Sequence, residues 1–140
     1  MSKQNHVGEC TLLYQDHQLN PEDFLHFVET DEFGEDWRQL KLNDDEDTWA
    51  LQILIMCDPT GPPVIQGTGG LRKVRFAPKR WNVGKSGAVR VCYAYYPEHW
   101  TVLLVMAYGK NEKDNLTSEE KKGIKKYLEQ TESWLIKHNY

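Results

Sequence analysis

Long apolar runs are missing from the sequence, and cysteine is scarce. A membrane-spanning helix needs about 20 mostly apolar residues, and no stretch of the chain approaches that length. The N-terminal segment also lacks the apolar core of a secretory signal, so we expect neither export nor membrane insertion. The cysteines at positions 10, 57 and 92 form no Cys-x-x-Cys or Cys/His motif, which argues against a disulfide framework and a zinc site. This usage is typical of a reducing cytoplasm.

Two glycine-rich segments approach nucleotide-binding motifs, but each lacks a required residue. Gly67 and Gly69 begin a G-x-G-x-x-G pattern, yet Arg72 occupies the place of the third glycine. The segment VGKSG contains Gly-Lys-Ser, but Lys79 stands where a P-loop needs its first glycine, five positions before Gly84. The histidines show no metal-ligand spacing either. We therefore expect neither a cofactor nor a metal.

Acidic residues are missing from the middle of an otherwise acidic chain. The 140 residues carry a net charge of −4, which by itself argues against a nucleic-acid partner. Residues 1–58, however, hold 14 Asp or Glu against 3 Lys or Arg, and residues 59–97 hold none against 7. Such asymmetry along one chain favours a basic surface that binds a polyanion.

Apolar spacing predicts one α+β domain over residues 27–140, preceded by an N-terminal extension of uncertain structure over residues 1–26. Residues 27–30 resemble a short edge strand. Residues 31–42 have the amphipathic spacing of a helix, and a second helix is expected from a cap at Asn43 or Asp44 to a stop before Pro59. The two segments predict a helical hairpin.

A loop rich in glycine and proline at residues 61–70 separates the helices from three predicted strands, residues 71–77, 87–96 and 100–110. The last two are expected to pair in antiparallel fashion through a short connection. A Thr117–Glu120 capping box starts the final helix. Its expected buried stripe is Ile124, Leu128, Thr131 and Leu135, and the tryptophans predicted to lie in the core are Trp37, Trp49 and Trp134.

Basic residues alternate with apolar ones along the predicted strands. Alternation places Lys73 and Arg75 on one face of the first long strand and Arg90 on the corresponding face of the next. Closely spaced cations favour the binding of an anion, and the guanidinium group of arginine has a forked geometry suited to phosphate. The same pattern is also typical of a solvated strand face, and lysines protect sheet edges from aggregation.

Three blocks occur in the order VIQGTGGLRKVRFA, GKSGAVRVCYAYY and LLVMAYGKNEKDNLTSEEK. In this order and context they resemble the RelE superfamily of bacterial toxins, most closely its HigB-like branch of type II toxin–antitoxin systems. The resemblance runs from about Phe27 to the C-terminus. It implies a RelE-like α+β fold with a mostly antiparallel, curved sheet of about four strands, an N-terminal helical hairpin and a C-terminal helix.

The resemblance also implies an activity in the cytoplasm. Such toxins act as mRNA interferases, that is, as metal-independent endoribonucleases that cleave ribosome-bound mRNA, inhibit translation and arrest growth. A cognate helix-turn-helix antitoxin silences them. In this chemistry the 2′-hydroxyl is deprotonated and attacks the adjacent phosphate, arginines stabilise the added charge, and a cation helps the 5′-oxygen to leave.

Matched motif by motif, the catalytic positions of the family fall on Lys73, Arg75, Arg90 and Lys110. The resemblance implies that Lys73 is the general base or its electrostatic partner, that Arg75 and Arg90 hold the phosphate, and that Lys110 assists. The candidate RNA contacts are cations that grip phosphates and aromatic rings that stack on bases. They are Arg72, Lys79, Arg80, Trp81, Lys85 and Tyr108.

Two positions depart from the pattern of the family. Ala88 stands where many relatives have a second glycine, and Asn111 stands where some relatives place an arginine, which leaves the acid role unassigned. Two alternatives therefore stay open. One is a catalytically inactive RelE-like module that binds an antitoxin or RNA without cleaving it, and the other is a plain RNA-binding protein.

Overall fold

The order of the strands and helices is that of an α+β fold, with two consecutive helices after the first strand and three consecutive strands before the last helix. The computed structural model describes residues 19–42, 44–81, 87–109 and 115–139. The α-helices are α2 (Asp31–Gln39), α3 (Asp45–Cys57) and α4 (Ser118–Lys137), and the strands are β1 (His26–Glu29), β2 (Arg72–Phe76), β3 (Val89–Tyr96) and β4 (Thr101–Tyr108). Three short 3-10 turns complete the described elements, namely η1 (Pro21–Asp23), η2 (Lys79–Trp81) and η4 (Pro97–His99).

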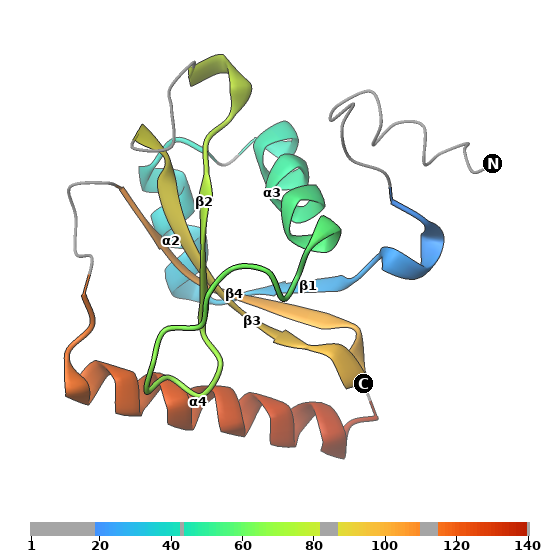
Figure 1. Ribbon diagram of the computed structural model, residues 1–140, viewed down its shortest axis with the longest axis vertical. Coiled ribbons are helices and arrows are strands. Elements are labelled where there is room, and N and C mark those ends of the chain that lie inside the picture. Colours follow the sequence, from blue (N-terminus) through green and yellow to red (C-terminus); the bar gives the residue numbers. More distant parts are fainter. Residues whose placement is uncertain (1–18, 43, 82–86, 110–114, 140) are drawn as a thin grey trace.

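The strands form one mixed sheet in the order β1-β4-β3-β2. β2 pairs with β3, and β3 with β4, in antiparallel fashion, whereas β1 pairs with β4 in parallel. The parallel pairing was not expected from the sequence. It arises because the chain leaves β1 through α2 and α3, builds β2 and β3, and returns with β4 in the centre of the sheet (Figure 1).

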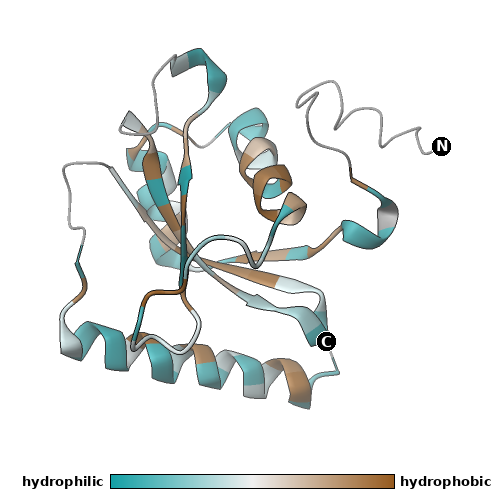
Figure 2. Cartoon of the chain, viewed as in Figure 1, coloured by the Kyte–Doolittle hydropathy of each residue, from teal (hydrophilic) through white to brown (hydrophobic). Residues whose placement is uncertain are grey.

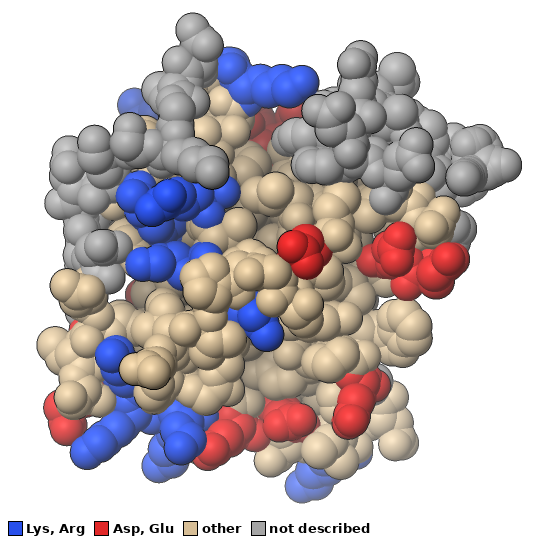
Figure 3. Space-filling view, in the orientation of Figure 1, with Lys and Arg blue, Asp and Glu red and all other residues tan. Residues whose placement is uncertain are grey.

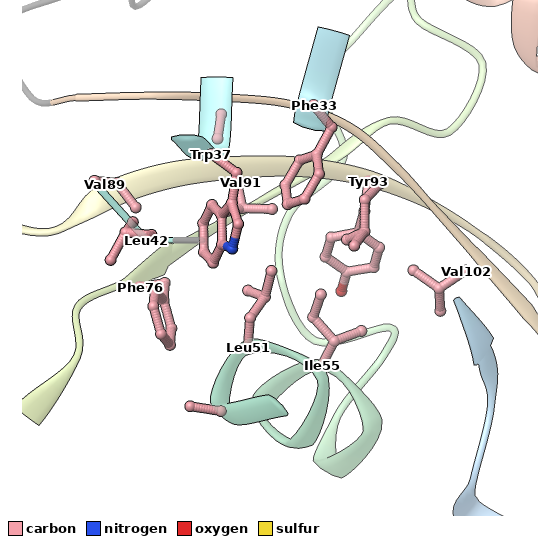
Figure 4. Close-up of a cluster of buried hydrophobic side chains, with 13 residues drawn as sticks. Phe33, Trp37, Leu42, Leu51, Ile55, Phe76, Val89, Val91, Tyr93 and Val102 are labelled. Atoms are coloured by element: carbon pink, nitrogen blue, oxygen red, sulfur yellow. The ribbon is translucent and has the colours of Figure 1, made fainter. Parts of the chain in front are cut away.

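Helices cover both faces of this sheet, with the α2–α3 pair on one side and α4 on the other (Figure 1). The α2–α3 side buries the larger apolar cluster, which includes Phe33, Trp37, Leu51, Val91 and Tyr93 (Figure 4). The α4 side buries a second cluster, in which Leu128 and Leu135 pack on β3 and β4. In Figure 2, brown apolar segments mark much of β4 and parts of α3, whereas α4 alternates between teal and brown.

A side-chain cap starts each α-helix, and the caps of α3 and α4 lie where the sequence predicts them. Thr30 caps α2, Asp44 caps α3, and the Thr117–Glu120 capping box is present at α4. The predicted helical hairpin is confirmed, and the indole Nε1 of Trp37 in α2 donates to the hydroxyl of Thr48 in α3 at 3.1 Å. These caps satisfy backbone N–H groups that a helix leaves without an internal partner.

The expected stripe of α4 is confirmed, because Leu128 and Leu135 are buried and Ile124 is partly buried against the same cluster. The prediction that Trp134 lies in the core is wrong. Its side chain is exposed and stacks on the ring of His138, four residues along the helix, with centroids 4.1 Å apart. No helix in the described part of the chain is both long and apolar enough to cross a bilayer.

Candidate functional site

Arg75 and Arg90 are direct partners across the antiparallel β2–β3 ladder. Val74 and Phe76 pack toward α2 and α3, and so does Val91, so alternation turns both arginines to the α4 face of the sheet. Lys73 lies on the same face, two positions from Arg75 and opposite Cys92. The face predicted from the sequence is therefore confirmed. We call Lys73, Arg75 and Arg90 the cationic row.

The cationic row lies at the end of the sheet that α4 does not cover. Arg75 is exposed, and Lys73 and Arg90 are half-buried. Arg90 is held in place locally, since its guanidinium donates to the carbonyl oxygen of Ala88 at 2.6 Å. Figure 3 shows Lys and Arg side chains along the course of β2 and onto the first half of α4. Like charges directly opposite one another destabilise a sheet, so this arrangement suits an anionic ligand.

A β-bulge brings Tyr108 to the same face. Cys92 pairs with Met106 whereas Tyr93 pairs with Leu104, so Val105 is an extra residue in β4. One extra residue reverses the alternation of the side chains that follow. Leu104 accordingly packs toward α2 and α3, while Tyr108 packs toward α4 and is paired with Arg90. The aromatic ring therefore extends the line of Arg75 and Arg90 across a third strand.

The N-terminal half of α2 occupies the edge of β4 beyond the end of β1. Thr30 donates its backbone N–H to the carbonyl of Leu104 at 3.0 Å and its hydroxyl to the carbonyl of Val105 at 2.8 Å. Six residues further on, the carboxylate of Asp36 accepts the backbone N–H of Ala107 at 3.0 Å. These contacts replace strand pairing at the bulge and bring acidic residues of α2 beside the cationic row.

A cavity of about 590 Å³ lies beside the cationic row. Its charged lining residues come from three elements, Lys73 on β2, Glu32 and Asp36 on α2, and Lys121 on α4. Tyr108 and Asn115 add polar groups, and the apolar part of the wall is formed by Ile65, Cys92, Met106, Ala107 and Leu116. Only Lys73 and Tyr108 of this lining were predicted as site residues. The carboxylates gave no sequence signal beyond their spacing of four residues on a helix.

Two of the predicted RNA contacts, Arg72 and Arg80, form hydrogen bonds within the protein. The guanidinium of Arg72 points away from the cationic row and donates to the carbonyl oxygens of Thr60 and Pro62, each at 2.8 Å. On the same side, the hydroxyl of Tyr93 donates to the carbonyl of Pro59 at 2.7 Å, and burial raises the pKa of Tyr93 to about 12. Arg72 thus fixes the loop that leads from α3 to β2.

Arg80 joins η2 to the first turn of α3. Its guanidinium binds both carboxylate oxygens of Asp47, a side chain that is only 2% exposed, and it reaches the carbonyl of Lys41 at 3.4 Å. The hydrogen bond that Arg80 donates to the carboxylate of Asp47 raises the pKa of Arg80 above its ordinary value. A bidentate pair of this kind holds the segment after β2 against the helical hairpin.

The remaining predicted contacts differ in their surroundings. Lys79 is exposed on η2, next to Arg80. Trp81 is half-buried and packs against the apolar cluster under α2 and α3. Lys85 and Lys110 lie outside the described residues. The described members of the predicted catalytic set, Lys73, Arg75 and Arg90, are therefore the ones that the fold brings together.

The glycine-rich loop before β2 packs against α4. Gly67 and Gly69 have φ values of +85° and +75°, a backbone conformation that glycine adopts without strain. A Cβ atom added to Gly69 would lie 2.9 Å from Cγ of Lys125, and one added to Gly67 would lie 3.3 Å from Cδ of Lys121. The glycines therefore allow a close contact that sets the distance between β2 and α4, and with it the width of the cavity.

No protein-family model matches the chain. Within the part of the chain that the structure describes, no group of three or more His, Cys, Asp or Glu side chains has an arrangement that could hold a metal ion. The cationic row and the cavity beside it are therefore the features of the described residues that indicate a function.

Proposed function

We propose that this protein is the toxin of a type II toxin–antitoxin system and acts as a ribosome-dependent mRNA endoribonuclease of the RelE superfamily, HigB-like branch. The observation that carries the proposal is the direct pairing of Arg75 with Arg90, with Lys73 two residues away on the same face. Such an array is costly without an anion. It offers two guanidinium forks to one phosphodiester group.

The roles of the residues follow from their placement. Arg75 and Arg90 hold the scissile phosphate from one side and stabilise the negative charge that grows as the 2′-oxygen attacks. Lys73, within about 7 Å along the same strand, is positioned to take the proton of the 2′-hydroxyl or to stabilise the resulting alkoxide. Ribosomal RNA and mRNA supply the polyanion. Positioning contacts to phosphates make such binding sensitive to salt.

The order of elements supports the same proposal. The resemblance implies a sheet of about four strands, a helical hairpin and a terminal helix, and the described residues provide a four-stranded sheet, two consecutive helices and a terminal helix. The glycine-rich block serves the packing of β2 on α4, and the basic block supplies the cationic row. The first two of the three blocks that carry the resemblance therefore have a physical role at the site.

Controlled expression in a bacterial host tests the proposal. Induction of the wild-type chain should arrest growth and produce cuts in translated messages that follow the codon phase. Arg90→Ala should abolish both effects at equal expression and with an unchanged circular dichroism spectrum. Arg38→Ala is the matched control, because Arg38 is exposed on α2 and its guanidinium pairs with Glu35, which is also exposed.

Three outcomes would contradict the proposal. Normal growth with intact messages on induction of the wild type would favour the inactive binding module. Arrest that persists with Arg90→Ala would place the chemistry elsewhere on the molecule. Rapid cutting of naked RNA by the pure protein, at the rate seen with ribosomes, would indicate a free ribonuclease.

A further inference from the structure

The cavity beside the cationic row differs from the row in its charge. The row presents cations alone, whereas the cavity combines the ammonium groups of Lys73 and Lys121 with the carboxylates of Glu32 and Asp36. A phosphate placed inside the cavity would meet both carboxylates at close range, which is unfavourable. The cavity therefore suits a group that is neutral overall but carries hydrogen-bond donors and acceptors.

A nucleobase has these properties, and the cavity has a matching shape. Its volume of about 590 Å³ lies in the usual range of pockets for small ligands. Met106, Leu116 and Ile65 provide an apolar surface, and the half-buried ring of Tyr108 lies next to them. Proteins that read single-stranded RNA place a base on such a surface and bind the polar edge of the base with side chains.

The cationic row and the cavity share residues and therefore lie next to each other. Lys73 belongs to the cationic row and also lines the cavity, and Tyr108 lines the cavity while pairing with Arg90. The cavity thus begins about 7 Å from Arg75, a separation comparable to the length of one nucleotide. A phosphate bound by the arginines would leave a neighbouring base within reach of the cavity.

We propose that this cavity is a base-specific subsite for the RNA strand, in which the carboxylate of Glu32 selects a base that carries an exocyclic amino group over uracil. This inference rests on the proposed function. Asp36 also accepts the N–H of Ala107 with one of its oxygens, so replacing Asp36 would disturb β4, and we assign the selection to Glu32, the other carboxylate of the lining. A carboxylate only accepts hydrogen bonds; it accepts from the amino group of cytosine, and it repels the O4 carbonyl oxygen of uracil.

Binding of mononucleotides to the purified full chain tests the subsite without any cleavage. Cytidine 3′-monophosphate and uridine 3′-monophosphate share the sugar and the phosphate, so a difference in Kd reports the base. We expect the cytidine nucleotide to bind about tenfold more tightly. Glu32→Gln should reduce the ratio to below about threefold, because an amide can also donate to O4 of uracil. Glu35→Gln, an exposed neighbour on the same helix, should leave the ratio unchanged.

The pattern of cuts in cells provides the second measurement. With the wild type, uridine should be depleted at one position next to the cut, and Glu32→Gln should restore it there while the total number of cuts stays similar. Equal binding of the two nucleotides, no binding of either, or a ratio that Glu32→Gln leaves unchanged would overturn the subsite. A wild type that prefers the cytidine nucleotide but cuts no message would instead retain the subsite and contradict only the proposed nuclease.

Discussion

The clearest physical consequence of the cationic row is that the fold should become more stable when one of its arginines is neutralised. We consider Arg75→Gln, because Arg75 is exposed and its direct partner Arg90 is half-buried. Opposite residues of an antiparallel pair have Cβ atoms about 5 Å apart, and repulsion would spread the two guanidinium groups to about 7 Å. At an effective dielectric constant of about 40, between water and a protein surface, the repulsion is about 1.2 kcal/mol before screening.

Salt reduces this repulsion in a predictable way. At an ionic strength of about 0.02 M the Debye length is about 20 Å, and Arg75→Gln should raise the free energy of unfolding by about 0.8 kcal/mol. At about 0.5 M the Debye length is about 4 Å, and the gain should fall to about 0.2 kcal/mol. Urea unfolding of wild type and variant at both salt concentrations measures the difference. The Arg75→Gln variant should also lose its growth-arrest activity by roughly 10²-fold or more.

Arg38→Gln provides the control of opposite sign. Arg38 forms an exposed pair with Glu35, so its neutralisation should cost at most about 0.5 kcal/mol at low salt. The reasoning would be refuted if Arg75→Gln lowered the stability, or if its gain were the same at both salt concentrations. Either result would mean that the two guanidinium groups do not face one another across the strands.

Two further predictions concern the packing around the site. Gly69→Ala should lower the free energy of unfolding by about 1–2 kcal/mol, because Gly69 has a positive φ and an added Cβ would contact Lys125. Gly123→Ala should raise the free energy of unfolding by up to about 1 kcal/mol in the same urea assay, because a Cβ added there meets nothing within 4 Å. Burial raises the pKa of both Tyr93 and Tyr96 to about 12. An unfolded tyrosine ionises near pH 10. The contribution of the two neutral tyrosines to the free energy of unfolding should therefore be complete below pH 10 and be lost as the pH rises toward about 12. Tyr96→Phe should reduce that loss, and an unchanged pH profile of stability for this variant would contradict the assignment.

Local pattern was sufficient to predict the faces of the long strands. Successive side chains alternate whatever the partner strand is, so the common face of Lys73, Arg75 and Arg90 could be found without any knowledge of the topology. The caps at Asp44 and Thr117 were predictable for the same reason, since each satisfies backbone groups within its own turn.

Long-range pairing could not be predicted in this way. The sequence presents Arg72 and Arg80 as cations like the others, but the fold supplies loop carbonyls to the first and the buried carboxylate of Asp47 to the second. Trp134 fits an apolar helical pattern, yet it falls just beside the stripe that packs on the sheet. For both arginines the deciding contact lies in a segment that the local pattern does not contain.

The position of Tyr108 shows how one such contact determines the site. Counting alternate residues from Leu104 would turn Tyr108 toward α2 and α3, away from Arg90. The extra residue Val105 reverses that count, and the hydroxyl and N–H of Thr30 hold the backbone carbonyls at the bulge. The same segment begins α2 and so brings Glu32 to the cavity. The bulge therefore places both an aromatic ring and a carboxylate beside a row of cations, as the proposed binding of a phosphate and its neighbouring base by different parts of one surface requires.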